Sequence, residues 1–210
     1  MIYQPAEDSY LLEKEVKTYI KRLKSNNKKN KDLNNIKVLD MGSGSGIQAK
    51  AAIKLGINRN NVICADIAKE AVYYLRKQKL KAIKTNLFSN IKKNIKKSNK
   101  KENKFNLIIF NPPYLPKNQY DNNYDTTSGK TGNETIIKFL KQAKPYLKKQ
   151  GSILLLFSSF SKPKIILKQA KKLKYKAKKL AEKNIFFEKL YVYEFSIKEQ
   201  NGKKSRTNTK

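Results

Sequence analysis

Short apolar runs alternate with helix-like stretches over the first half of this chain. They follow one another as strand, glycine-rich turn, helix, strand, helix and strand, at residues 37–41, 42–46, 47–55, 61–66, 68–78 and 81–86. Two parallel strands can be joined only through a crossover, which is usually a helix. The alternation therefore predicts an α/β fold whose mostly parallel sheet is covered by helices on both faces.

The rest of the chain extends this pattern and ends differently. Further predicted elements are a lead-in helix, a strand, a helix, a strand and a helix, at 9–24, 105–110, 133–148, 152–157 and 165–173. Alternating segments within 175–197 predict a terminal antiparallel hairpin, which makes a seven-stranded sheet. We expect one domain over 1–198, with an N-terminal helical lead-in over 1–35, a low-complexity Lys/Asn loop over 91–104 and a disordered basic tail over 199–210.

The chain carries a large positive charge, most of which comes from lysine. Lys+Arg of 48 against Asp+Glu of 16 give a net charge of +32, but only four of these cations are arginine. Arginine is the residue best suited to bidentate contacts with phosphates and bases, so the lysine surplus fits the composition of an AT-rich genome better than a dedicated nucleic-acid site. A field this strong still predicts non-specific contact with RNA or ribosomes.

Cysteine and histidine usage removes several kinds of chemistry. Cys64 is the single cysteine, and the chain has no histidine. These counts exclude an intrachain disulfide, a Cys/His zinc site and a Ser-His or Cys-His catalytic pair, and we expect no metal site. The longest apolar run, 153–157, is far too short for a membrane helix, and residues 1–10 lack a signal-peptide pattern. We expect a cytoplasmic protein with no membrane partner.

The glycine-rich turn carries the first candidate site. It reads Gly-x-Gly-x-Gly at Gly42, Gly44 and Gly46, whereas a dinucleotide-binding turn would read Gly-x-Gly-x-x-Gly. Asp40, just before the turn, suits a ligand with a cationic ammonium and sulfonium, and Asp66 ends the next strand, where it can accept hydrogen bonds from ribose hydroxyls. The spacing favours S-adenosylmethionine over NAD. An ordinary tight turn, with Asp66 as a helix cap, is the alternative.

The second candidate site follows the strand at 105–110. That strand ends at Asn111-Pro-Pro-Tyr114, where two prolines must end the ladder of hydrogen bonds. In an open parallel sheet, ligands bind beyond the carboxyl ends of the strands, so this loop and the glycine-rich turn are expected at the same edge.

Together these motifs resemble the amino-group methyltransferases, which modify planar exocyclic or amide nitrogens. The opening Tyr3-Gln-Pro-Ala-Glu-Asp-Ser-Tyr-Leu-Leu12 narrows the resemblance to the short, archaeal and eukaryotic form of the HemK-related release-factor glutamine N5-methyltransferases. The glycine-rich stretch Gly129-Lys-Thr-Gly-Asn-Glu134 also resembles that family, and the similarity covers residues 2 to 196.

The resemblance implies a Rossmann-like class I methyltransferase fold, with one group of site residues binding the cofactor and another holding the target. Residues expected to bind S-adenosylmethionine, some of them already indicated by the glycine-rich turn, are Ser9, Asp40, Gly42, Gly44, Gly46, Asp66, Asn86, Leu87 and Asn111. Asn111, Pro112, Pro113 and Tyr114 are expected to hold the target as the catalytic residues. Two departures stand out: Asn86 replaces the family's usual Asp, and the chain lacks the tryptophan often found before the glycine-rich stretch.

The chemistry explains why such a loop is needed. An amide nitrogen is a poor nucleophile, because its lone pair is delocalised into the carbonyl group, and deprotonating it first would be prohibitive. The Asn111 side-chain oxygen and the Pro112 carbonyl can instead accept its two N–H groups and turn the lone pair toward the methyl donor. Tyr114 would pack against the planar amide. Positioning and preorganised acceptors then provide the rate.

Other functions fit parts of this sequence. Adenine or guanine amino-methylation of a nucleic acid would use the same loop, and the charge favours it, but we recognise no target-recognition module. Protein-lysine methylation is a further alternative, and a basic ribosome-associated protein that has lost activity is the non-enzymatic one. The resemblance also implies a small zinc-binding activator protein as a partner, for which the apolar residues 62–64 are a candidate surface.

Overall fold

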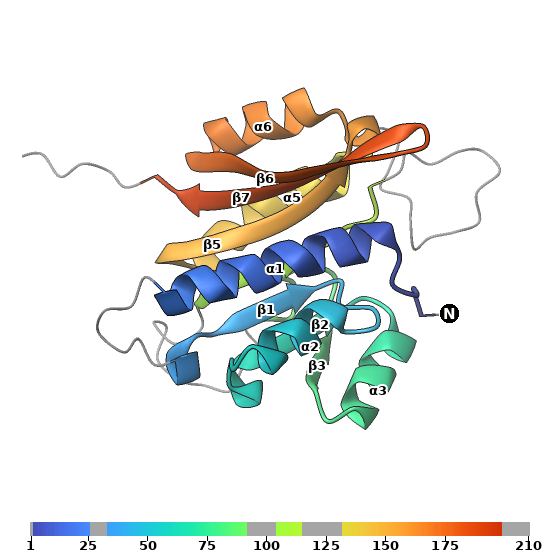
Figure 1. The fold of residues 1–210 in the computed structure, drawn as a ribbon, viewed down its shortest axis with the longest axis vertical. Coiled ribbons are helices and arrows are strands. Elements are labelled where there is room, and N and C mark those ends of the chain that lie inside the picture. The colour runs from blue at the N-terminus through green and yellow to red at the C-terminus, as the bar shows by residue number, and fades with distance from the viewer. Residues whose placement is uncertain (1, 26–32, 92–103, 115–131, 199–210) are drawn as a thin grey trace, which may run out of the picture.

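The computed structural model describes residues 2–25, 33–91, 104–114 and 132–198 (Figure 1). Its strands are β1 Val38–Met41, β2 Val62–Asp66, β3 Lys81–Lys84, β4 Phe105–Phe110, β5 Leu147–Ser158, β6 Tyr175–Ile185 and β7 Glu188–Ile197. The helices are α1 Glu7–Ser25, α2 Ile47–Lys54, α3 Lys69–Lys77, α5 Glu134–Ala143 and α6 Pro163–Lys172, with 3₁₀ turns η1 Leu33–Asn35, η2 Arg59–Asn61, η3 Lys144–Tyr146 and η4 Ser159–Ser161. Most of the predicted loop at 91–104 and all of the tail at 199–210 lie outside the described residues.

The strands form one seven-stranded sheet in the order β3-β2-β1-β4-β5-β7-β6. The five strands from β3 to β5 are parallel, and β7 pairs antiparallel with both β5 and β6. The predicted mostly parallel sheet with a C-terminal antiparallel hairpin is confirmed. Because β1, β2, β4 and β5 run in the same direction, their carboxyl ends meet at one edge of the sheet.

Helices cover both faces of the sheet, and each face has its own core. One core joins α1, α2 and α3 to inward residues of the strands, such as Val38, Leu107 and Leu154, while the other places α5 and α6 against Leu39, Ile108 and neighbouring residues. The central strands β1 and β2 are buried along their whole length, as strands of a doubly covered sheet must be. Among the described residues, no helix combines the length and hydropathy needed to cross a membrane.

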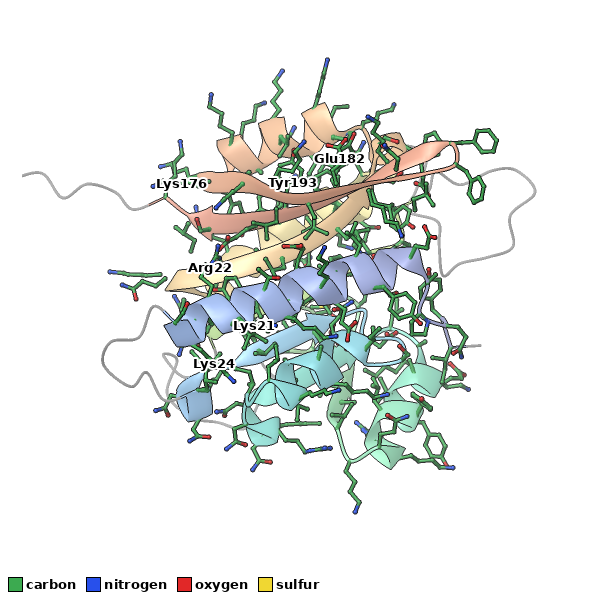
Figure 2. The ribbon with its side chains drawn as sticks, viewed as in Figure 1. Lys21, Arg22, Lys24, Lys176, Glu182 and Tyr193 are labelled. Atoms are coloured by element: carbon green, nitrogen blue, oxygen red, sulfur yellow. The ribbon has the colours of Figure 1, made fainter. Side chains whose placement is uncertain are left out.

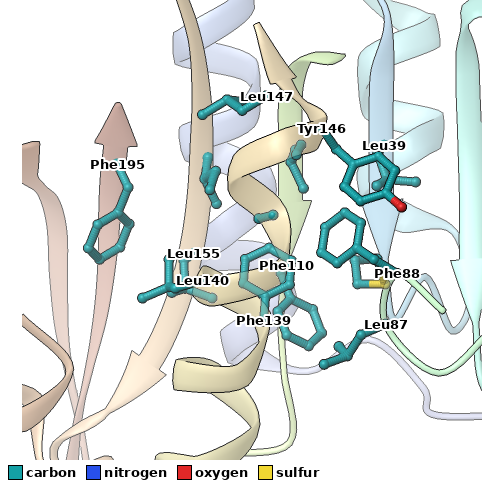
Figure 3. Close-up of a cluster of buried hydrophobic side chains, with 14 of the residues drawn as sticks. Leu39, Leu87, Phe88, Phe110, Phe139, Leu140, Tyr146, Leu147, Leu155 and Phe195 are labelled. Atoms are coloured by element: carbon teal, nitrogen blue, oxygen red, sulfur yellow. The ribbon is translucent and has the colours of Figure 1, made fainter. Parts of the chain in front are cut away.

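Aromatic packing fixes the end of β4, which leads directly into Asn111. The Phe110 ring lies 4.5 Å from that of Phe139 on α5, measured between centroids, and Phe88 stacks on Tyr146 at 4.8 Å. Figure 3 shows these rings together with Leu87 and Leu155 between the sheet and α5. The loop after β4 therefore starts from a rigid position.

Two predictions about this fold are wrong. The helix expected over 133–148 ends at Ala143, because Pro145 lacks an N–H donor and the chain passes through η3 into β5, which begins at Leu147 rather than at 152. The partner surface expected at 62–64 is also wrong. Those residues lie within β2, buried between β1 and β3, and cannot face a second protein.

Candidate active site

A cavity of about 170 Å³ opens at the carboxyl ends of β1, β2 and β4. Its walls come from four places in the chain: the N-terminal segment through the first turn of α1, the glycine-rich turn with the start of α2, the end of β2 with the start of α3, and the loop after β4. In Figure 1 the first turn of α1 lies at the same end of the sheet as the tip of β1. The topology thus brings together segments about 100 residues apart.

Most of the predicted site residues line this cavity. Those that do are Ser9, Asp40, Gly42, Gly44, Asp66, Asn111, Pro112, Pro113 and Tyr114. Gly46 lies behind the cavity at the start of α2, and Asn86 and Leu87 follow β3 beyond its lining, with Leu87 buried in the core on the α5 side of the sheet. The roles assigned to these residues stay predictions.

The glycine-rich turn needs glycine for packing as well as for close approach to a ligand. At Gly46, φ is +77°, and a Cβ atom would lie 2.6 Å from Leu75 Cδ2. At Gly42, φ is +61°, and a Cβ atom would lie 3.1 Å from the Phe110 ring. A side chain at either position would be strained by the backbone and would also press on the core.

Two side chains tie the glycine-rich turn to the neighbouring strand. The Ser43 hydroxyl donates to the Asp40 carbonyl at 2.6 Å and accepts from the Ala65 amide at 3.0 Å. Asp66 accepts from Gly44 N at 2.8 Å through one oxygen and from Ala68 N at 2.9 Å through the other. The latter bond lies just before α3, whose N-cap residue is Ala68 and has no side-chain capping bond, so Asp66 does not cap that helix as the alternative interpretation expected. Each carboxylate oxygen keeps a second acceptor position for a ligand.

Asp40 is a buried carboxyl group beneath the turn. Its Oδ2 accepts from Ala49 N, in the first turn of α2, at 3.1 Å. Burial, reinforced by the charge of Asp66, raises the pKa of Asp40 from its ordinary value of 3.8 to about 7, although the Ala49 hydrogen bond opposes the shift. A cationic ligand group in the cavity would stabilise the ionised form.

This shift predicts how pH affects stability. Between pH 4 and 7 the folded protein keeps the Asp40 proton that the unfolded chain has lost, so the free energy of unfolding falls as pH rises, by up to about 1.4 kcal/mol per pH unit, and levels off above pH 7. Asp40→Asn, which keeps the acceptor for Ala49, should remove this contribution. Urea unfolding of both proteins from pH 4 to 8 measures it; curves that stay parallel would contradict the prediction.

Asn111 is held by a buried carboxylate that the sequence analysis did not assign to the site. Asn111 Nδ2 donates to Asp8 Oδ2 at 2.9 Å, and Asp8 is only 4% exposed. Asp8 also accepts from Ser9 N at 2.6 Å, from the Tyr3 hydroxyl at 3.1 Å and from the Tyr114 hydroxyl at 3.5 Å. Asp8 belongs to the N-terminal motif, but no sequence pattern links it to Asn111, which lies 103 positions away.

Two amide oxygens remain without partners at this cavity. Since Nδ2 faces Asp8, Asn111 Oδ1 is left buried with no hydrogen-bond partner among the residues that the structure describes. Gln48 behaves alike: its Nε2 donates to the Ser9 carbonyl at 2.9 Å, and its buried Oε1 has no partner within the same described ranges. Buried acceptors are normally satisfied, so a ligand with N–H or O–H donors fits this cavity.

The two tyrosines at the cavity act as donors. Burial, together with the nearby Asp8 carboxylate, raises the pKa of Tyr3 and of Tyr114 well above the ordinary value of 10. Both hydroxyls therefore stay protonated at physiological pH. The Tyr114 carbonyl accepts from Ser161 Oγ at 2.9 Å, which ties the loop after β4 to η4.

Comparison with known proteins identifies the family. The profile of the methyltransferase small domain matches residues 18–186 of the chain. The chain belongs to this methyltransferase family. The sequence is also 32% identical over 202 residues to MJ0928 of Methanocaldococcus jannaschii, by name a candidate protein N5-glutamine methyltransferase, covering 91% of this chain and 89% of that protein. The resemblance stated from the sequence motifs is confirmed.

Solved structures of methyltransferases share the fold. The E. cuniculi Mtq2-Trm112 complex, which methylates the termination factor eRF1, contains a chain that matches with a TM-score of 0.66 at 22% identity, over 94% of this chain and 99% of that one. The ribosomal protein L11 methylase of Lactobacillus delbrueckii subsp. bulgaricus matches with a TM-score of 0.59 at 18% identity, over 91% and 80%. The class I methyltransferase fold predicted from the sequence is thus confirmed.

As a member of this methyltransferase family, the chain is an enzyme that uses S-adenosylmethionine. The cavity fits that cofactor. The ammonium group and the ribose hydroxyls of S-adenosylmethionine can donate hydrogen bonds, and the side-chain oxygens of Gln48, Asp40 and Asp66 can accept them. Backbone amides of a glycine-rich turn lie at one side of the cavity, and Ile67 and Ala71 supply apolar surface on another. S-adenosylmethionine brings an electrophilic methyl group to this site.

Proposed function

We propose that this methyltransferase modifies the side-chain amide nitrogen of the glutamine in the Gly-Gly-Gln loop of a translation release factor. One observation carries the proposal: Asn111 presents at the cavity a buried oxygen that has no partner among the residues described, while its own NH₂ group is held by Asp8. An acceptor fixed in this way suits the N–H of a planar amide. The relatives support the same choice, through the name of MJ0928 and the eRF1 methylation by Mtq2-Trm112.

The residues of the loop each have a defined task in this proposal. Asn111 Oδ1 accepts one N–H of the glutamine amide, and the carbonyl of Pro112, the next residue, accepts the other. The Tyr114 ring packs against the amide plane and its hydroxyl stays protonated, so the tyrosine positions the target without taking its proton. Once methylated, the nitrogen is acidic and loses its proton readily. The enzyme contributes position and preorganised acceptors.

The proposed cofactor residues lie around the same cavity. Ser9, Asp40, Gly42, Gly44 and Asp66 are the lining residues that we assign to S-adenosylmethionine, with Gln48 added because of its unpartnered oxygen. The positions predicted after β3 remain part of the proposal. Asn86 follows that strand with an exposed side chain, where an adenine amino group could donate to its amide oxygen.

Transfer of radiolabelled methyl from S-adenosylmethionine tests the proposal. Acceptors are the release factor of the same organism, its Gln→Ala version in the Gly-Gly-Gln loop, and total RNA. We expect label on the factor and none on the Gln→Ala version. Label on RNA alone would overturn the proposal in favour of nucleic-acid methylation, and label on the Gln→Ala factor would point to another residue, such as a lysine.

We also infer that a small activator protein takes part, since the Mtq2 structure contains Trm112. Repeating the assay with the organism's corresponding protein should then increase transfer. If the chain alone is soluble and equally active, no activator is needed. If label is missing from every acceptor with and without the activator, the proposed function is wrong.

A further inference from the structure

Two phenylalanines at the tip of the C-terminal hairpin are fully exposed to solvent. Phe186 is 101% exposed and Phe187 is 93% exposed, between the end of β6 and the start of β7. Other aromatic residues of the same hairpin behave differently: Tyr191 and Tyr193 pack against the core, and the Tyr193 ring stacks on Phe157 at 5.2 Å. Adjacent aromatic rings left in solvent forgo the stabilisation of burial and commonly mark a binding surface.

The hairpin tip borders the active site. Glu188, the first residue of β7, accepts a hydrogen bond from Ser158 at the carboxyl end of β5, and Lys189 N donates to Ser159 Oγ at 3.1 Å. The η4 turn that begins there also contains Ser161, whose hydroxyl binds the Tyr114 carbonyl at 2.9 Å. Hydrogen bonds therefore connect the tip to the catalytic loop through one short turn.

A second connection joins the hairpin to α1. Lys183, near the end of β6, lies 3.4 Å from the Glu7 carboxylate, one residue before Asp8. Figure 1 shows the turn of the hairpin projecting beyond the sheet on the side where α1 begins. Phe160 adds a third exposed ring, 45% exposed, in η4, the turn that is hydrogen-bonded both to the start of β7 and to the loop after β4. We call Phe160, Phe186 and Phe187 the aromatic rim.

The charges beside the rim favour a protein over a nucleic acid. Glu182 and Glu188 flank the tip on its two strands together with Lys183 and Lys189 (Figure 2). Glu182 is ion-paired with Lys179 and Lys189, so the tip offers no continuous positive surface to a phosphate backbone. Residues 158–164 and 182–189, which surround the rim in the sequence, contain no arginine, the cation best suited to stack on bases and bind phosphates. Lys162 and Lys164 are exposed next to Phe160, so the surface combines apolar rings with positive charge. That combination fits an apolar patch bordered by acidic residues on a protein.

We propose that the aromatic rim docks the folded body of the protein substrate, away from the residue that is methylated. This inference rests on the proposed function, because it takes the substrate to be a protein whose target loop enters the cavity. A loop in the cavity leaves the rest of that protein beside the sheet edge, where the rim projects. The rim then adds affinity that a short peptide carrying only the loop cannot use.

A double substitution, Phe186→Ser with Phe187→Ser, separates docking from chemistry. We expect kcat/KM for the intact release factor to fall about tenfold, mainly through KM, while transfer to a short peptide carrying the Gly-Gly-Gln loop is unchanged. The Kd of S-adenosylmethionine, measured by calorimetry, and the Tm should also be unchanged. Tyr73→Ser is the matched control, since Tyr73 is an aromatic residue of α3 that is 61% exposed and lies outside the rim.

The remaining outcomes distinguish the two proposals. Equal losses with factor and peptide, or no loss with either, would overturn docking at the rim while the proposed function stands. Loss of binding to polyuridine together with full activity on the factor would assign the rim to RNA and also overturn it. A wild-type enzyme that labels neither factor nor peptide would instead contradict the proposed function.

Discussion

Asn111→Ala should lower methyl transfer to the release factor by about 10²–10³-fold, chiefly through kcat. The substitution removes an acceptor that is buried at the cavity, has no partner among the described residues and is held in place by Asp8, so the glutamine N–H loses its fixed position. The Kd of S-adenosylmethionine should change far less, since the Gly-rich turn, Asp40, Asp66 and Gln48 remain. Single-turnover transfer and calorimetry on the same preparation measure the two effects.

Gln48, whose amide oxygen also has no partner among the described residues, provides a control for this experiment. Gln48→Leu removes Oε1 and keeps the volume, so under our assignment it should weaken cofactor binding more than it slows transfer at saturating cofactor. The two variants then have opposite profiles. If Asn111→Ala weakened cofactor binding as much as it slowed transfer, Asn111 would be a cofactor ligand only, and its proposed role toward the target amide would fail.

The strands and helices were largely predictable because their signals are local. A glycine-rich turn between an apolar run and a helical pattern specifies strand, turn and helix whatever the rest of the chain does, and the sheet edge that gathers the site follows from parallel topology. Local patterns failed where tertiary pairing decides. Lys148, Lys149 and Gln150 look like a helix end or a loop, yet they belong to β5, which the apolar pattern placed only from residue 152.

The site was predictable residue by residue only where a motif carried it. The Asn111 loop and the glycine-rich turn were found, but the contact between Asp8 and Asn111 has no sequence signal, because it depends on how α1 lies over the sheet edge. Gln48 was missed for the same reason. In the sequence it is one polar residue in the first turn of a helix, and only the bond from its Nε2 to the Ser9 carbonyl shows that its buried oxygen has no partner among the described residues. No pattern singles out the aromatic rim: Phe186 and Phe187 fall within the segment predicted to form the terminal hairpin, and Phe160 falls between two predicted elements.

Asp8→Ala should slow transfer by about 10²-fold while leaving S-adenosylmethionine bound, because Asp8 positions Asn111. Removing the carboxylate takes away the acceptor for Asn111 Nδ2 and frees the donors of Ser9, Tyr3 and Tyr114. Those donors attract an oxygen, so the Asn111 amide should turn over and present its NH₂ group to the cavity. A target N–H would then meet a donor instead of an acceptor.

The order of activity among variants tests this argument. Asp8→Asn keeps an oxygen that can accept from Asn111 and should retain much more activity than Asp8→Ala, although both lose a buried charge. Glu7→Ala is the matched control, since Glu7 shares the first turn of α1 but its one ion pair within the described part of the chain is with the exposed Lys183 side chain, a contact of little energetic weight. Initial rates of methyl transfer give the comparison among the three variants, with Tm as a check on folding. If Asp8→Asn were as slow as Asp8→Ala at equal Tm, the charge of Asp8 rather than its hold on the Asn111 amide would be what the reaction needs.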